Sequence, residues 1–502
     1  MTSIAAAAPT HAFARPAVAL ATAGSSGLLL ALAAPPFGFG WLAWVALVPA
    51  AAVAVRQAGT RTGRAAVPLA FAIFLELLIV PALPFGIADH QWGEPPIPIM
   101  VGDSPVFAAA LVGIPLAALL LYAIDFPFLG APRRGVLVVV VPATAWAALD
   151  VLRVKFDPSG LFGPLFLTQS DLPTARLAAL GGPWLVTFAL VAVAFALASS
   201  TTRFCVGMAL AVLVALAAAG AMAANTGATV RVAVVQPGYD TSEFDRPVLH
   251  WLRRVNRNLP RASRDLISDL APLTRDAARR GATLVVWPEA TLWVDPHGDT
   301  PTRRDLERLA GTTGAAVVVP YFLRGPDHGA TAVVLPSGVI TRAQPKQRPM
   351  WFLGEQGGNR AAPRPVVTPA GRLGTMLGVD NQDAGVAREL AAAGAALIGS
   401  STHDWKQLAP QQRAFTQIHA VAVGRPILRA DWRNGSFVVG GDGEIRADAG
   451  GATRRTVLVA DVRLGSGETL YVRTGDLVGW GAVAGALVVA GAAFVRRRAT
   501  AS

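Results

Sequence analysis

A glutamate follows directly on a short run of strand-forming residues. Thr283–Trp287 reads Thr-Leu-Val-Val-Trp, and Pro288 and Glu289 come next. β-Branched and aromatic residues in so short a run predict a strand buried in a sheet. Sites in open α/β sheets gather at the carboxyl ends of strands, and partial burial raises a carboxyl pKa into the range of a general base. Glu289 is therefore a candidate base; the alternative is a surface glutamate after a turn.

Lys346 is a candidate for holding a developing negative charge. It lies in Gln344-Pro-Lys-Gln-Arg348 and is one of very few lysines in an arginine-rich chain. In a catalytic pocket an ammonium group stabilises an oxyanion as a point charge. Glu355 follows in the same loop and offers a second carboxylate. The alternative for Lys346 is a solvated loop cation.

The third feature is the run Gly371–Asp380, which is followed by a polar cluster. This run predicts a strand over 372–379, and Asn381-Gln-Asp383 follows it. The cluster is either an Asx turn or the wall of a site. Asp380 is the acidic residue nearest the predicted strand end.

The chain has a single cysteine, Cys205, far along the sequence from these three features. A thiolate is the side chain that best attacks an unactivated acyl group at neutral pH. Cys205 begins an apolar segment, which favours a small apolar filler. One cysteine excludes an intrachain disulfide framework, and no residue spacing predicts zinc. We expect no metal and no cofactor.

Other nucleophiles are weaker candidates. An acyl anhydride on Asp380 would be a poor store for a fatty chain. The hydroxyls of Ser400, Ser401 and Thr402 would each need a base of their own. His403 and His419 are predicted to lie on a loop and on a helix surface.

Composition places much of the chain in lipid. Of its 502 residues, 53% are hydrophobic and only 15% charged, against about 25% charged in a soluble domain. The formal charge of +12 comes from arginines that flank apolar segments, so it indicates lipid contact and topology rather than nucleic acid. We predict eight spans: Ala17–Ala34, Trp41–Val55, Ala66–Ala88, Pro105–Ala123, Val136–Val151, Gly182–Ala198, Val206–Ala224 and Leu477–Val495.

Loop charges predict the orientation. The exits of the even-numbered spans are basic, as at Arg56, Arg133, Arg203 and Arg496–Arg498. This positive-inside pattern places both termini in the cytoplasm and the polar block between spans seven and eight outside. Arg153 and Lys155 after span five are a local exception. A cleaved N-terminal signal peptide is the alternative, but another span follows at once.

The polar block alternates strands with helices. Strand runs include Val230–Gln236 and Thr283–Trp287, and Ser263–Arg280 has helical spacing and ends at Gly281. Further strands are predicted at 315–321, 330–335, 372–379, 395–398, 426–430 and 436–439, with a helix at 411–423. We therefore expect a membrane domain (1–228), an α/β extracytoplasmic domain (229–473), and a last span with a basic tail (474–502).

Several segments, taken in order, resemble the apolipoprotein N-acyltransferases, membrane-embedded members of the nitrilase (carbon–nitrogen hydrolase) superfamily. The similarity covers almost the whole length. It is carried by Leu32–Pro49, Pro142–Trp146, Gly181-Gly182, Val234–Pro237, Val286-Trp-Pro-Glu289, the Lys346 loop with Gly354-Glu355, Ser401–Trp405, and Gly424–Ala430 with Asn434-Gly435.

The resemblance implies an αββα sandwich and a Glu–Lys–Cys triad. In that family the thiolate takes an acyl chain from a phospholipid and passes it to the N-terminal lipidated cysteine of a lipoprotein. By resemblance Glu289 is the base, Lys346 the oxyanion-stabilising lysine and Glu355 an accessory glutamate. The implied partners are a phospholipid donor and a lipoprotein acceptor, in the bacterial inner membrane.

The chain departs from the family where the nucleophile belongs. Aligned without a gap, Gly378 takes the position of the cysteine and Asp380 that of the acidic residue; a shifted alignment would put Asp380 at the nucleophile position. His403 stands where an asparagine is expected. Two hypotheses follow: an acyltransferase with impaired or altered catalysis, or a catalytically silent homologue that binds lipid or lipoprotein or partners an active enzyme.

Overall fold

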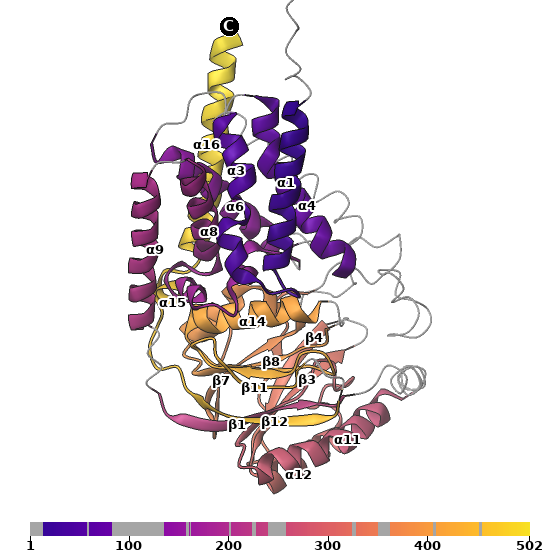
Figure 1. Cartoon of the computed structure of the whole chain (residues 1–502). Coiled ribbons are helices and arrows are strands. Elements are labelled where there is room, and N and C mark those ends of the chain that lie inside the picture. The colour runs from indigo at the N-terminus through magenta and orange to yellow at the C-terminus, as the bar shows by residue number, and fades with distance from the viewer. Residues whose placement is uncertain are drawn as a thin grey trace, which may run out of the picture.

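A computed structural model describes residues 14–57, 60–82, 135–156, 160, 162–199, 202–222, 227–238, 258–323, 328–349, 362–404, 408–450 and 454–501. A bundle of helices stands on an α/β sandwich (Figure 1). The predicted span Pro105–Ala123, Glu355 and Trp405 lie outside the described residues.

The bundle contains helices that coincide with seven of the predicted spans. Its members are α1 (Ala14–Ala33), α2 (Ala43–Ala46), α3 (Val48–Arg56), α4 (Arg61–Ala82), α6 (Leu137–Phe156), α7 (Ala178–Gly181), α8 (Pro183–Ala198), α9 (Thr202–Met222) and α16 (Leu477–Ala501), with the 3₁₀ turns η1 (Gly40–Leu42), η5 (Leu165–Gln169) and η6 (Pro173–Leu177).

By length and apolarity, one described helix passes as a candidate membrane span, Leu137–Phe156. A second passes if Pro173–Gly181 and Pro183–Ala198, between which the helix axis bends by 119°, form one broken span. The bend falls at Gly182, whose φ of 72° is left-handed, and Pro183 then starts α8; glycine tolerates that φ without strain and proline suits a first helical turn. Shorter apolar helices cover Leu20–Ala33, Gly40–Arg56, Cys205–Gly220 and Leu477–Ala492.

The sandwich consists of two six-stranded sheets. The first has the order β12-β1-β2-β3-β4-β5 and the second β11-β10-β9-β8-β7-β6. Parallel strands occupy the middle of each sheet, β1–β2–β3 and β7–β8–β9. The strands are β1 (Thr229–Gln236), β2 (Leu284–Val286), β3 (Ala316–Leu323), β4 (His328–Val334), β5 (Gln344–Pro345), β6 (Val366–Thr368), β7 (Gly371–Leu377), β8 (Leu397–Ser401), β9 (Ile427–Ala430), β10 (Phe437–Val439), β11 (Ile445–Asp448) and β12 (Thr456–Arg463).

Helices cover both outer faces of the sandwich. On the first sheet lie α11 (Leu259–Arg279) and α12 (Thr300–Thr313), and on the second α13 (Ala384–Ala392) and α14 (Ala409–Val423). A third cluster of Val, Leu and Ala side chains, such as Val234, Val286 and Leu428, fills the space between the sheets. The αββα layering expected from the sequence is therefore present.

Helix α14 is the layer that joins the sandwich to the bundle (Figure 1). Phe415 on α14 packs edge-on against Phe166 at 5.7 Å, and Phe166 packs in the same way on Trp184 of α8. Gln411 and Gln417 hydrogen-bond to Gly163 and Asp171 of the bundle. One apolar core therefore runs continuously from the bundle into the second sheet.

Two sequence predictions needed correction here. His419, predicted on a helix surface, is fully buried in α14, because α14 is covered on both faces by the second sheet and by the bundle. Strand β7 ends at Leu377 rather than at residue 379, and Gly378–Gln382 form a 3₁₀ turn, η8.

Candidate functional site

Glu289 lies just past the end of β2 and is held through its main chain. Its N–H donates to Thr402 O at 3.2 Å, and its own carbonyl accepts from Trp432 Nε1 at 2.7 Å. Two residues earlier in the chain, Trp287 O accepts from Ser401 Oγ at 2.7 Å. Ala290 has a φ of 55°, rare for a residue with a side chain and costly enough to mark a constrained turn.

Lys346 reaches this carboxylate from the other side. Its N–H donates to Gly329 O at 2.9 Å, which continues the pairing of β4 with β5. Its Nζ lies 3.2 Å from Glu289 Oε1, with the lysine side chain 3% exposed and the glutamate 19%. A charge so buried requires an opposite partner, and Glu289 is that partner.

Gly378 completes the group at the first residue after β7. Its φ is 55°, and a Cβ built on it would lie 2.5 Å from Glu289 Oε1 and 2.7 Å from Oε2. A side chain at 378 would therefore point straight at the Glu289–Lys346 pair. The structure thus brings together Glu289, Lys346 and the position from which the sequence resemblance expected a sulfur.

Asp380 accepts hydrogen bonds from main-chain N–H groups of the same region. It is buried, and its two carboxylate oxygens accept from the N–H groups of Leu377, Gln347 and Arg348 at 2.7–3.2 Å. Burial raises the pKa of this carboxyl to about 6, against the opposing effects of Lys346 and the three N–H groups. Because these donors occupy both oxygens, Asp380 fastens the lysine loop to the end of β7.

Two of the three hydroxyls considered from the sequence are hydrogen-bonded outside the Glu289–Lys346 pair. Ser401 Oγ donates to Trp287 O, and Thr402 Oγ1 lies 3.2 Å from both Ala430 O and Asp431 Oδ2. Ser400 is buried and its Oγ has no hydrogen-bond partner among the described residues. None of the three is shown hydrogen-bonded to an imidazole or carboxylate base of the Glu289 site.

A second polar cluster, which sequence reasoning did not assemble, adjoins Glu289. Asp431 accepts from the N–H groups of Asp404, Arg433 and Asn434 and so shapes the turn after β9. That turn carries Trp432, whose indole holds Glu289 O. The signal for it was the polar Asp-Trp-Arg-Asn run at the carboxyl end of a predicted strand.

His403 belongs to this cluster rather than to an open surface. Its ring lies 6.0 Å from that of Trp432. Burial lowers the pKa of the imidazole to about 4, with Arg433 acting in the same direction and Asp431 against it. Asp404 pairs with the buried Arg429. No cluster of three or more His, Cys, Asp or Glu residues that could hold a metal occurs in the described part of the chain.

An ion-pair network connects the lysine loop to the bundle. Arg348 Nη1 lies 2.5 Å from Asp383 Oδ2, and Arg348 Nη2 donates to the carbonyls of Val154 and Lys155 at the end of α6. Lys155 Nζ in turn contacts Asp383 at 3.2 Å and Asp476, just before α16, at 3.0 Å. Arg348 is two residues from Lys346, so the end of α6 and the site share one short segment.

Cys205 lies on α9 in the bundle. Its Sγ is 3.4 Å from Ala196 O of α8, and it lines a cavity whose walls contain neither Glu289, Lys346 nor Gly378. This agrees with its interpretation as an apolar filler.

Comparison with known proteins finds two family matches that follow one another along the chain. Residues 26–196 match the apolipoprotein N-acyltransferase N-terminal domain, and residues 231–471 match the carbon–nitrogen hydrolase family. The apolipoprotein N-acyltransferase of Geobacter metallireducens is 25% identical over 525 residues, with 94% of each chain covered; that of Gloeobacter violaceus is 26% identical over 497 residues, with 90% of this chain and 89% of the relative covered. A solved carbon–nitrogen hydrolase from Helicobacter pylori G27 is 19% identical, with a TM-score of 0.38, over 47% of this chain and 89% of that one. With both domains matched in succession, the chain belongs to the apolipoprotein N-acyltransferase family.

Proposed function

We propose that this protein is an apolipoprotein N-acyltransferase homologue whose transfer of acyl chains from phospholipid to lipoprotein is impaired, because its site has no sulfur nucleophile. The observation that carries the proposal is Gly378, whose missing Cβ would point at the Glu289 carboxylate. Glu289 would act as base and Lys346 as oxyanion partner, with Asp380 positioning the lysine loop. Glu355 is kept as an accessory carboxylate by resemblance alone.

A thioester route balances only with a thiol at position 378. The thiolate would attack the ester carbonyl of a phospholipid, release the lysophospholipid alcohol, and hold the acyl group as a thioester; the amine of the acceptor would then displace the sulfur. Without sulfur the first covalent bond cannot form. What remains is a charge pair that can orient a carbonyl and polarise it.

One observation favours a second function, a silent lipid- or lipoprotein-binding homologue. Glu289 Oε1 and Lys346 Nζ pair with each other, and the Glu289 oxygens lie within 2.7 Å of where the Cβ would be. The carboxylate thus occupies part of the space that a nucleophile needs. On this alternative the site serves binding, or the chain partners an active acyltransferase.

We further propose that residues 1–228 and 474–502 form a multi-pass domain in the cytoplasmic membrane, with 229–473 on the outer side and both termini inside. Phe156 and Trp480, 66% and 44% exposed, meet at the sandwich end of the bundle with ring centroids 6.3 Å apart. Arg496–Arg498 lie at the other end of α16, away from the sandwich. Aromatic residues at one interface and arginines on the cytoplasmic side support this orientation.

The test measures acyl transfer by purified protein from phosphatidylethanolamine to a diacylated lipopeptide. We expect no detectable transfer by the unmodified chain and a trace by Gly378→Cys, with Gly378→Ser and Gly378→Cys/Lys346→Met as controls that stay silent. Robust transfer by the unmodified chain would refute the impairment. An acyl adduct trapped on the unmodified chain and located by mass spectrometry would identify another nucleophile.

A further inference from the structure

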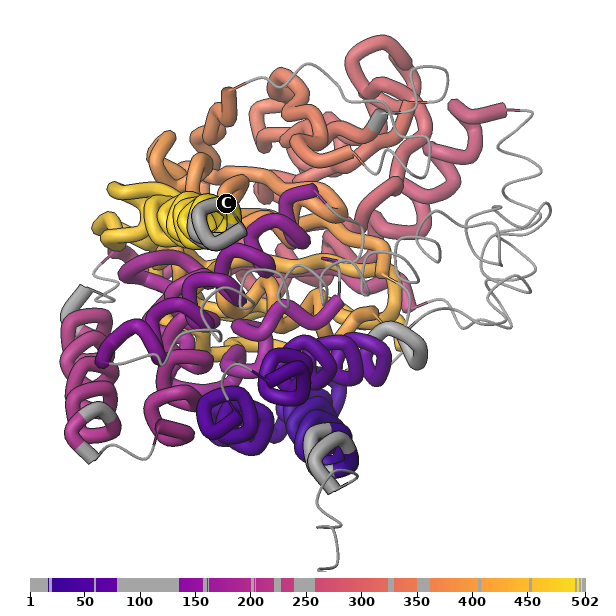
Figure 2. Tube along the Cα trace, turned by 90° about the horizontal axis from the view of Figure 1, so that it is seen from above, coloured from indigo at the N-terminus to yellow at the C-terminus, as the bar shows by residue number. Residues whose placement is uncertain are grey.

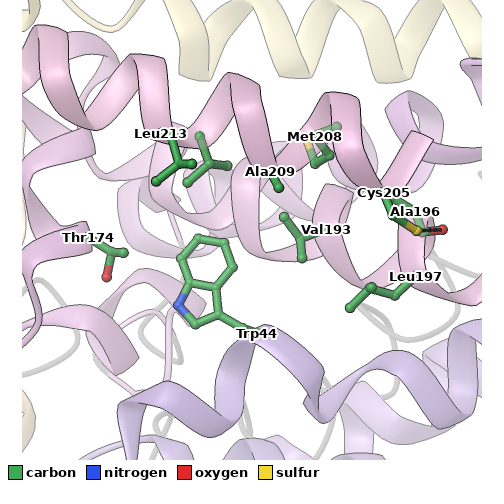
Figure 3. Close-up of a pocket in the computed structure, with 10 residues that line it drawn as sticks. Trp44, Thr174, Val193, Ala196, Leu197, Cys205, Met208, Ala209 and Leu213 are labelled. Carbon is green, nitrogen blue, oxygen red and sulfur yellow. Dashed lines mark hydrogen bonds between the residues drawn. The ribbon is translucent and has the colours of Figure 1, made fainter. Parts of the chain in front are cut away.

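An apolar cavity of about 350 Å³ opens within the bundle, between α2, η6, α8 and α9 (Figure 3). Its walls are formed by Trp44, Thr174, Val193, Ala196, Leu197, Cys205, Met208, Ala209, Val212 and Leu213. No charged residue is among them. The indole of Trp44 rises from one side toward the aliphatic side chains of α8 and α9 on the other (Figure 3).

The polar groups on these walls already have partners. Trp44 Nε1 and Thr174 Oγ1 both donate to Gln169 Oε1, at 2.9 and 2.7 Å, and Cys205 Sγ is directed at Ala196 O. A polar ligand or a water cluster needs free donors and acceptors, whereas an apolar cavity excludes water and accepts apolar molecules. The chemistry of the walls therefore selects hydrocarbon.

Helix α9 is poorly covered by the protein itself. It stands at the edge of the bundle in both views (Figures 1 and 2). Among its residues whose burial is described, only Ala219 is buried, while Val206, Leu210, Leu213 and Val214 are 59–63% exposed. A helix this apolar gains stability only where hydrocarbon covers it.

A nearby positive charge indicates which kind of apolar molecule would bind in the cavity. Arg203 is exposed in the first turn of α9, two residues before Cys205 and at the same end of the helix as this part of the cavity wall. A cation at a helix end beside an apolar cavity suits the phosphate of a lipid whose chain enters the cavity. A free apolar molecule has no anionic group that could pair with Arg203.

We propose that this cavity holds one acyl chain of a bilayer phospholipid, with the lipid phosphate facing Arg203, so that the lipid wedges α9 against α8. This lipid site is separate from the Glu289 site, because the two share no residue. The inference rests on the proposed membrane location but not on the proposed chemistry.

The test places the full chain in nanodiscs of phosphatidylcholine containing a small fraction of phosphatidylcholine with a diazirine on one acyl chain. After irradiation, we expect adducts on wall residues of α8 and α9. Excess unlabelled phospholipid should suppress them several-fold, and free fatty acid of the same length should not. Ala209→Trp, which fills the cavity, should abolish these adducts, whereas the matched Leu210→Trp, on the exposed face of α9, should preserve them.

The single cysteine supplies a second readout. Alkylation of Cys205 by N-ethylmaleimide should be several-fold slower in nanodiscs than in delipidated detergent solution, and Arg203→Gln should narrow that difference. Equal labelling of the wall in the parent and in Ala209→Trp would overturn the proposal, as would cross-links between copies through Cys205 in place of lipid adducts.

Glu289→Gln should leave both readouts unchanged, so failure of the chemistry and failure of the lipid site are distinguishable. The exposed Leu487 of α16 should also be labelled in the parent protein, because it would face the bilayer. If neither Leu487 nor the cavity wall is labelled, the membrane location and the lipid site are both wrong.

Discussion

At position 378 a single missing carbon sets the geometry of the site. Gly378 has a left-handed φ, and a Cβ at position 378 would lie too close to the Glu289 carboxylate. The backbone at 378 therefore favours glycine for two independent reasons, one conformational and one steric. Lys346 is held by Glu289 in the same space, so a nucleophile installed here must displace the carboxylate before it can act.

Gly378→Ala is expected to destabilise the protein by about 1–3 kcal/mol, because it adds contact with Glu289 to the cost of a left-handed φ. The matched control is Gly314→Ala, where φ is 67° and a Cβ would meet nothing within 4 Å, so that only the conformational cost of about 1 kcal/mol remains. Thermal unfolding in detergent measures both. If Glu289→Ala does not reduce the penalty at 378 to that of the control, the steric explanation is wrong.

Asp380 predicts a pH dependence of stability. Its folded pKa of about 6 exceeds the ordinary value of 3.8, so the native state binds the proton more tightly than the unfolded state. The contribution of Asp380 to the free energy of unfolding should therefore fall as pH rises from about 4 to about 6, by roughly 3 kcal/mol at most. Asp380→Asn should flatten this slope in thermal unfolding scans, whereas Asp276→Asn, which changes a 40% exposed carboxylate, should keep it. An unchanged slope in Asp380→Asn would assign the pH dependence to another group.

At the scale of elements, the segment Gln344–Arg348 connects three parts of the fold. It pairs with β4, its main chain is fastened by Asp380 to the end of β7, and Arg348 caps the end of α6. The lysine is therefore positioned by both the sandwich and the bundle. Movement of α6 relative to the sandwich would be transmitted directly to Lys346.

Arg348→Met should cost about 1–3 kcal/mol, because the carbonyls of Val154 and Lys155 lose their donor and Asp383 keeps only Lys155 as its cation. Arg348→Lys should recover only part, since an ammonium cannot reproduce the planar fork that meets several acceptors. Arg231→Met removes an ion pair that is about half exposed and should cost at most about 1 kcal/mol. Chemical denaturation compares the three; equal losses in Arg348→Met and Arg231→Met would refute a special role for the junction.

Local sequence patterns predicted the strands and helices of the sandwich well, but they did not predict which strands pair with one another. Runs such as Val230–Gln236 and the helical spacing of 263–280 predicted β1 and α11 to within a few residues, because β1 is a continuous β-branched run and one face of α11 is apolar at a helical period. The antiparallel pairing of β1 with β12 joins residues more than 200 positions apart, and no local signal encodes it. The strand end at Leu377 was missed because it depends on Asp380 accepting hydrogen bonds both from the nearby Leu377 N–H and from the distant Gln347 N–H.

At the scale of the whole molecule, the two domains share one core through α14, so orientation in the membrane is a property of the entire chain. The proposed topology predicts accessibility from opposite sides. In a Cys205→Ala background, Arg308→Cys, at a side chain 73% exposed on α12, should react in intact cells with a membrane-impermeant maleimide. Arg498→Cys should react only after the membrane is opened. Labelling of both cysteines in intact cells would contradict the orientation.

The candidate site was predicted in part from the sequence. Glu289 and Lys346 lie together and Gly378 lies beside them, as the order of motifs suggested. The Asp431 turn, the contact of Trp432 with Glu289 and the Arg348 junction were not predicted, because each depends on hydrogen bonds between segments that only the folded chain brings together. Glu355 stays a prediction.

The fastening of the lysine loop by Asp380 has an evolutionary consequence. Carboxylate-to-backbone hydrogen bonds fix the loop and the end of β7, and none of these bonds involves a side chain at position 378. Glycine and cysteine codons can differ by one nucleotide at their first base. A lineage carrying this scaffold can therefore exchange glycine and cysteine by one point mutation and keep these backbone bonds, although any side chain at position 378 meets the strained φ and the Glu289 carboxylate.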